Sequence, residues 1–203
     1  MTGRRWFLPE TPDVLGLLRR QVAVTIEGVD AFVDWAAGDS GGAERVRDAE
    51  QRGDQAKREL LTQLRAAFVT LLEPEDVFAL SRGVDRILDY ARDLVNESSA
   101  MEAPPDAGVA EMGRLLAAAL RDLDRAMATL GSDGDAATAA ADAAIAKERE
   151  LERAYYTGMA ALLAVSDRSE RIARRELYRR CSRIGETVVD VAERVVYAVV
   201  KQG

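Results

Sequence analysis

The sequence predicts an all-α protein of two pseudo-repeated three-helix bundles, with six long helices in total. Hydrophobic residues make up 48% of the chain and charged residues 31%, whereas aromatic residues reach only 5%, a balance that favours helices over a sandwich or barrel. The five prolines fall where a helix would begin or a linker would lie: Pro9, Pro12, Pro74, Pro104 and Pro105. Between these prolines, apolar residues recur at helical spacing.

Three helices are expected before the central proline pair. Thr11 is expected to be the N-cap of a first helix that begins at Pro12 and ends near Gly38. Its apolar seam contains Leu15, Leu18, Val22, Ile26, Val29 and Val33. A second helix follows Gly42, and its seam contains Val46, Ala49, Gly53, Ala56, Leu60, Leu64 and Phe68. A third helix begins at Pro74, and its seam contains Val77, Leu80, Val84, Ile87, Ala91 and Leu94.

Three more helices are expected after the proline pair. The fourth ends at Gly131, and its seam contains Met112, Leu115, Leu116, Ala119, Leu123 and Met127. A fifth helix, rich in alanine, runs from Ala136 to Leu163. A turn at residues 165–167 then leads into a sixth helix that ends near Val200.

Pro104 and Pro105 mark the clearest break in composition, almost at the middle of the chain. We therefore expect residues 1–103 to form the first three-helix half and residues 104–203 to form the second half. The two halves are expected to make one compact domain overall.

Composition also excludes several classes of protein. The net charge of -7 and the pI near 4.9 argue against a general attraction to nucleic acid. Cys181 is the only cysteine, which rules out an intrachain disulfide and favours a reducing compartment. Pro9 interrupts the first apolar run too early for a signal peptide, and residues 188–200, the most apolar later stretch, contain charges. We therefore expect a soluble cytoplasmic protein.

Four of the expected helices carry two acids separated by three residues, which places both carboxylates on one helical face. The pairs of the first half, here called the first acidic group, are Glu50 with Asp54 and Asp85 with Asp89. Those of the second half, the second acidic group, are Glu148 with Glu152 and Glu186 with Asp190. A single pair is typical of a solvated face, but the second-half pairs follow their counterparts at similar intervals, 98 positions for Glu148 and 101 for Glu186. This repetition favours a duplicated helical hairpin.

The chain contains no histidine, which excludes the Glu-x-x-His pairs of di-iron bundles and the usual zinc sites. Any metal must be held by oxygen atoms alone, as suits iron, manganese, magnesium or calcium. No Ser/His/Asp arrangement, glycine-rich phosphate loop or dinucleotide fingerprint is present, so an enzyme is not expected. Gly53 and Gly185 directly precede Asp54 and Glu186, which indicates either close helix packing or room for an ion.

Several of these segments resemble motifs of the PhoU family. Residues 84–91, Val-Asp-Arg-Ile-Leu-Asp-Tyr-Ala, resemble the acid-x-x-x-Asp helix motif of PhoU proteins. Residues 184–192 resemble the same motif in the PhoU-like accessory proteins of Pit-type phosphate permeases, and residues 50–54 resemble their helix-two motif. Residues 68–77 are similar to the family's turn between helices two and three. Leu151 and Glu152 depart from the pattern, where a small residue and Asp are usual.

The resemblance implies a regulator of phosphate uptake rather than a catalyst. Its partner would be the cytoplasmic side of a Pit-type inorganic phosphate permease, through which it would reach the membrane. Both acidic groups would bind metal ions, iron or another hard cation, with the second group the weaker site. A metal-free helical interaction or scaffold module stays open as the alternative, and a di-metal oxidase is disfavoured by the missing histidines. Association into a homo-oligomer also stays open.

Overall fold

Six α-helices joined by short connections make up the computed structural model, which describes residues 12–67 and 70–202. In chain order they are α1 (Val14–Ala36), α2 (Gly42–Ala66), α3 (Pro74–Ala100), α4 (Ala107–Thr129), α5 (Gly134–Ala161) and α6 (Arg168–Gln202), with a short 3-10 helix η1 (Leu162–Ala164) before α6. The described residues contain no strand, which confirms the all-α prediction. None of the described helices combines the length and apolar composition needed to cross a bilayer.

Capping side chains set several helix starts, with small corrections to the predicted limits. Asp13 rather than Thr11 caps α1, because its carboxylate accepts a hydrogen bond from the Gly16 backbone N–H at 2.8 Å. Thr11 itself lies outside the described residues. Asp133 caps α5 in the same way, so this helix begins at Gly134, two residues before the predicted start.

The predicted stops are close to the observed ones. Gly38 and Gly131 follow the ends of α1 and α4 with φ of 101° and 92°, a backbone conformation that glycine adopts without strain. At its other end α2 stops at Ala66, before the predicted seam residue Phe68, which falls outside the described residues.

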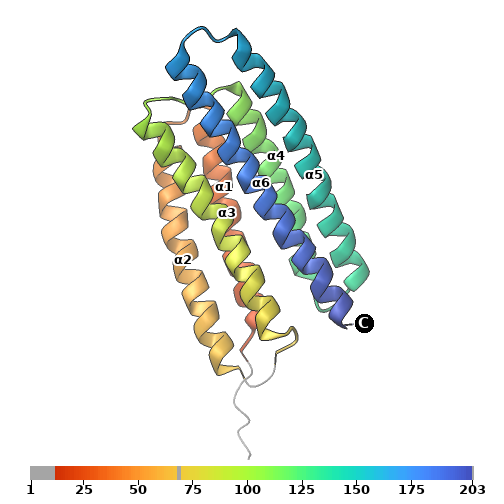
Figure 1. Ribbon diagram of the computed structural model, residues 1–203. Helices are drawn as coiled ribbons and strands as arrows, with labels where there is room; N and C mark the ends of the chain where they lie inside the picture. Colours follow the sequence, from red (N-terminus) through yellow and green to blue (C-terminus); the bar gives the residue numbers. More distant parts are fainter. Residues whose placement is uncertain (1–11, 68–69, 203) are drawn as a thin grey trace, which may run out of the picture.

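Four of the helices form a central ring, and the other two pack on its outside. Helices α1, α3, α6 and α4 form a ring in which each contacts the next, while α2 packs against α1 and α3, and α5 packs against α4 and α6 (Figure 1). Figure 1 looks onto the face that α3 and α6 form, with α2 and α5 on its two flanks. Helices α1 to α3 all contact one another, as do α4 to α6. The division of the chain at residue 104 into two units stays a prediction.

One continuous apolar core lies between the helices. Phe32 of α1, Leu80 of α3, Leu120 of α4 and Leu177 of α6 are fully buried in it. Burial of each such side chain stabilises the fold by about 1.5–3 kcal/mol. Cys181 packs in this core as well, and burial raises the pKa of its thiol, so it remains a protonated packing residue.

Candidate functional site

Helices α2 and α3 bring three carboxylates of the first acidic group together with two cations. The Lys57 ammonium group on α2 donates a hydrogen bond to Asp85 on α3, and the Arg92 guanidinium on α3 donates one to Glu50 on α2. Arg92 also lies 3.5 Å from Asp89. The chain's own cations therefore neutralise much of this acidic group, as expected for paired, partly buried charges.

Asp89 on α3 has a strongly raised pKa. Burial disfavours its ionised form and raises its pKa to about 6, and repulsion from Asp85 and Glu50 adds to the effect. Attraction to Arg92 and Lys57 works in the opposite direction. Asp89, Asp85 and Glu50 thus lie close enough to interact electrostatically across α2 and α3.

Asp54, the fourth predicted member of the first acidic group, pairs with a cation of its own helix. Its side chain is half exposed and lies 3.6 Å from Arg58, one turn further along α2. Gly53, beside it, is buried against α3, and a Cβ atom at this position would lie 3.1 Å from the Leu88 side chain. Close helix packing therefore accounts for this glycine, without a need for a bound ion.

Helices α5 and α6 bring together three members of the second acidic group. Glu148, Glu152 and Glu186 line one cavity of about 570 Å³. Burial raises the pKa of Glu148, and repulsion from Glu152 and Glu186 raises it further. In the part of the chain that the structure describes, no Lys or Arg nitrogen lies within 4 Å of these three carboxylates. Asp190 is separate and lines a smaller cavity of about 270 Å³ between α6 and α3.

The contact between helices is built differently in the two halves. On the first side, Gly53 of α2 faces Leu88 of α3. On the second side the sizes are exchanged, because Leu151 of α5 is fully buried against Gly185 of α6. The bulky Leu151, which departs from the PhoU motif, is therefore accommodated by a glycine on the facing helix.

The donor groups fit a metal ion only in part. Among residues 12–67 and 70–202, no three acidic or cysteine side chains are arranged to hold one. In the first acidic group, Lys57 and Arg92 already supply positive charge to Asp85 and Glu50. The second acidic group offers three carboxylates of the chemistry that hard cations prefer, but not at the spacing that coordination needs.

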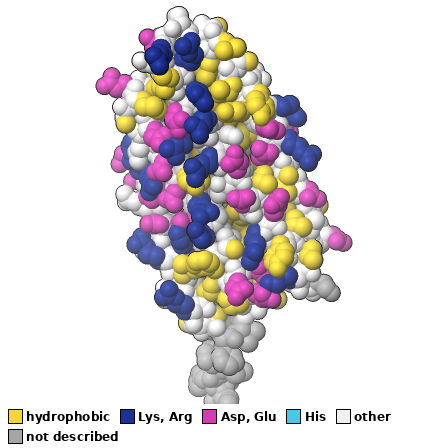
Figure 2. Space-filling model, in the orientation of Figure 1, with side chains coloured by type: hydrophobic (Ala, Val, Ile, Leu, Met, Phe, Trp, Pro, Cys, Tyr) yellow, Lys and Arg dark blue, Asp and Glu magenta, His cyan; other side chains and the backbone are white. Residues whose placement is uncertain are grey.

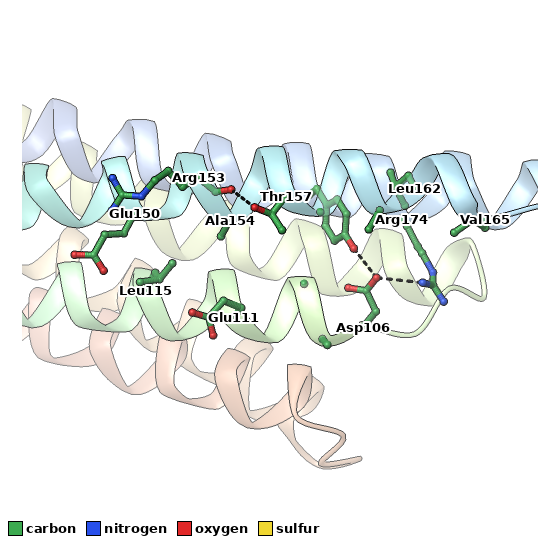
Figure 3. A pocket seen from close by; sticks show the side chains of 15 residues that line it. Asp106, Glu111, Leu115, Glu150, Arg153, Ala154, Thr157, Leu162, Val165 and Arg174 are labelled. Atoms are coloured by element: carbon green, nitrogen blue, oxygen red, sulfur yellow. Dashed lines mark hydrogen bonds and ion pairs between the residues drawn. The ribbon is translucent and has the colours of Figure 1, made fainter.

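A further cavity, of about 700 Å³, lies between α4, α5 and α6 and was not predicted from the sequence. Figure 3 shows Asp106 and Arg174 toward one end of it and Glu150 and Arg153 toward the other. Asp106 caps α4 through the Val109 backbone N–H at 3.0 Å, and it lies 3.4 Å from Arg174.

Tyr178 completes this arrangement from α6. Its hydroxyl donates a hydrogen bond to Asp106 at 2.6 Å. Burial and the bond to Asp106 raise the pKa of the Tyr178 phenol, so it remains a donor. The position of Asp106 directly after Pro105 suggests a helix cap from sequence alone, but nothing local indicates Tyr178, 72 residues later, as its partner.

The sequence matches no family model and no curated protein sequence. The fold is nevertheless similar to solved structures. One is a PhoU-like protein from Shewanella oneidensis MR-1, with a TM-score of 0.82 and 12% identity over 92% of this chain and 99% of that chain. Another from the same organism, named as a PhoU-like phosphate regulatory protein, gives a TM-score of 0.80 and 12% identity over 93% of this chain and 100% of that chain.

The phosphate transport system regulatory protein PhoU from Streptococcus pneumoniae is a third such structure. Its TM-score is 0.75, and it is 13% identical over 94% of this chain and 95% of that chain. The described helices therefore have the fold of the PhoU-like phosphate regulatory proteins, the family that the acidic helix motifs resemble.

Proposed function

We propose that the protein is a PhoU-like cytoplasmic regulator or accessory protein of inorganic phosphate transport. The observation that carries this proposal is the match of its six-helix fold to PhoU-like structures over at least 92% of this chain. Two of those structures are named as phosphate regulatory proteins. The resemblance of residues 184–192 to accessory proteins of Pit-type permeases supports such a permease as the partner.

Phosphate uptake by cells of the source organism tests this proposal. Deletion of the gene should change the rate of radiolabelled phosphate uptake, and the wild-type chain supplied in trans should restore it. A Pit-type permease purified in detergent should also retain the protein, whereas an unrelated transporter should not. Unchanged uptake at both low and high external phosphate would contradict the proposal.

We infer that this role is not catalytic. The chain contains no histidine, so a hydroxyl such as that of Ser182, which lines the cavity of the second acidic group, has no imidazole base to activate it. Binding and release of a partner need no such groups, so a regulatory role is consistent with the residues present.

We also propose that the acidic groups bind iron or another hard cation. Burial raises the pKa of Glu148 and of Asp89, and repulsion from neighbouring carboxylates raises both further. A bound cation would relieve that repulsion. A cation entering the first acidic group would have to displace Lys57 and Arg92. These ion pairs favour the second acidic group as the stronger site, although the sequence motifs favour the first.

Melting temperature with and without added iron or manganese tests the metal proposal. Metal should raise the melting temperature of the wild type, because a ligand that binds only the folded state stabilises it by mass action. If the second acidic group is the site, Glu148→Gln/Glu186→Gln should abolish this increase in melting temperature. If the first acidic group is the site, Asp85→Asn/Asp89→Asn should abolish it instead. Glu27→Gln/Glu59→Gln, which removes two exposed acids, serves as the control.

The alternative function is a metal-free helical interaction or scaffold module. The pairing of Lys57 with Asp85 and of Arg92 with Glu50 favours it, because the first acidic group already has counter-charges. Absence of any metal-dependent increase in the wild type, together with unchanged phosphate uptake after deletion of the gene, would favour this alternative.

A further inference from the structure

We propose that the face formed by α3 and α6 binds an acidic segment of a partner protein along a row of arginines. The row consists of Arg82 and Arg86 on α3 and Arg179 and Arg183 on α6, and it is called the arginine row below. The proposal rests on the proposed function only in that the partner would belong to a phosphate transport system.

The four arginines follow one another along the contact between the two helices. Arg82 and Arg86 line the cavity of about 270 Å³ between α3 and α6, and Arg179 and Arg183 line the cavity of about 570 Å³ on α5 and α6. The guanidinium of Arg183 lies 4.8 Å from the ring centre of Tyr90, one turn beyond Arg86, so the α6 arginines continue the line of the α3 arginines. Figure 2 shows Lys and Arg side chains following one another down the middle of this face.

The arginine row is short of anionic partners. Within the described ranges, Arg82, Arg86 and Arg183 have no carboxylate within 4 Å, and Arg179 approaches only Glu176, at 3.4 Å. All four arginines are exposed. Other exposed arginines of the described residues, such as Arg19 and Arg175, also lack such a partner, so the row is distinguished by its position along the cavities of two packed helices. The row therefore attracts anions to one defined line on an otherwise acidic protein.

The spacing of the row matches carboxylates on a polypeptide. Arginines four residues apart on a helix are separated by about 6 Å along its axis. Alternate side chains of an extended strand are about 6.6 Å apart, and acids at i and i+4 of a helix are about 6 Å apart, so either could meet successive arginines. The planar guanidinium also pairs with carboxylates through two parallel hydrogen bonds.

The acids beside the arginine row favour a narrow partner over a broad anionic surface. Glu148, Glu152 and Glu186 line the larger cavity with the α6 pair of the row. Asp190 lines the smaller cavity with the α3 pair. A membrane or a nucleic-acid duplex laid across this face would approach those carboxylates and be repelled by them. A single segment that follows the row avoids most of that repulsion, so we assign an acidic protein segment as the occupant.

Phe78 supplies an apolar contact at the end of the row near the start of α3. Its ring is half exposed and lines the same cavity as Arg82 and Arg86. It also lines a cavity between α2 and α3. An exposed aromatic side chain beside a charged row is typical of an interface anchor, so the segment should carry an apolar residue beyond its acids.

Fluorescence anisotropy of a labelled peptide tests this site on the full chain. The peptide, of about ten residues, alternates Asp with Ser and carries Leu at each end, and its counterpart has Lys in place of Asp. Only the acidic peptide should bind. Arg82→Gln/Arg86→Gln should weaken its binding about tenfold and Phe78→Ala several-fold. Arg114→Gln/Arg121→Gln, the same charge change on α4, should leave binding within about twofold.

Three results would overturn the proposal. Equal weakening in the α4 control variant would mean that only the total charge matters. Row-dependent binding to vesicles of phosphatidylserine and phosphatidylcholine, without binding to the peptide, would assign the face to a membrane. Self-association that Arg82→Gln/Arg86→Gln abolishes, again without peptide binding, would assign it to a second copy of the chain. None of these results depends on the phosphate-uptake phenotype, so the two proposals can fail separately.

Discussion

At the scale of single residues, Asp89 shows how burial and charge compete in the first acidic group. Its carboxyl lies near Asp85 and Glu50, which repel its ionised form, and near Arg92 and Lys57, which attract it. Burial is the largest effect and leaves its pKa at about 6, above the ordinary value of 3.8. Two cations are thus insufficient to keep Asp89 fully ionised at mildly acidic pH.

This raised pKa predicts a pH-dependent stability. Between its unfolded and folded pKa values, the folded protein holds a proton that the unfolded chain has lost. The stability from protonated Asp89 is therefore present at low pH and is lost as the pH rises through about 6. Asp89→Asn should be more stable than the wild type at neutral pH by about 1 kcal/mol, a value reduced for solvent screening because the side chain is 34% exposed.

Urea denaturation at neutral pH and near pH 4 measures this difference, which should vanish at the lower pH. Asp54→Asn is the matched control, because Asp54 is half exposed and, among the described residues, pairs only with Arg58 of its own helix. Its effect should stay within about 0.5 kcal/mol at both pH values. Destabilisation by Asp89→Asn at neutral pH would show that the ionised carboxylate stabilises the fold.

At the scale of helices, glycine and leucine form size-matched contacts between α2 and α3 and between α5 and α6. Gly53 faces Leu88 on one side, and Leu151 faces Gly185 on the other. A Cβ atom at Gly185 would overlap the fully buried Leu151 side chain, whereas one at Gly53 would leave 3.1 Å to Leu88. The α5/α6 contact is therefore the tighter of the two.

Alanine at these two glycines should have unequal effects. Gly185→Ala gains about 1 kcal/mol of helix propensity but overpacks Leu151, so we expect a net destabilisation of about 1–2 kcal/mol. Gly53→Ala should leave the free energy of unfolding almost unchanged, because the milder overlap of its Cβ atom with Leu88 offsets the same gain in helix propensity. Chemical denaturation of both variants measures the difference.

A double-mutant cycle checks the cause. Leu151→Ala alone should cost about 2–5 kcal/mol through the cavity that it leaves. Adding Gly185→Ala to it should cost nothing further, since the new methyl group enters that cavity. Strict additivity of the two substitutions would show that the Gly185 effect has another origin.

At the scale of the whole molecule, Asp76 joins the start of α3 to the end of α6. Its side chain is 2% exposed and lies 2.7 Å from Arg194, and it accepts a hydrogen bond from Lys201 at 2.9 Å. Lys201 also donates to Glu73, just before α3. A carboxylate from the N-terminal part of the chain is thus held by two cations near its C-terminal end.

Asp76→Asn should destabilise the fold by about 2 kcal/mol. Removing one partner of a fully buried pair costs about 3–5 kcal/mol, and the smaller value allows for the partial exposure of Arg194 and Lys201. Glu73→Gln is the control, because the Glu73 side chain is 59% exposed and its removal should cost under about 1 kcal/mol. Equal effects of the two variants on urea denaturation would contradict a role for burial at Asp76.

The helices themselves were predictable from the sequence because their signals are local. The spacing of apolar residues, Pro74 at the first position of α3 and the turn before α6 each depend on a few neighbouring residues. The acid pairs were predictable for the same reason, since residues four apart share a helical face. The PhoU-like fold followed from the order of these motifs along the chain.

The partners of those acids were decided only by the tertiary structure. Lys57 meets Asp85 and Arg92 meets Glu50, 28 and 42 residues apart, because the rotation and axial shift of packed helices determine which side chains face each other. The same packing places Asp190 in a different cavity from Glu186, although the two residues are one helical turn apart on α6. The sequence by itself determined the helices, their order and their acidic faces, because these depend on local periodicity. Ion pairs, cavities and the arginine row depend on how side chains from distant segments interdigitate, which no local pattern encodes.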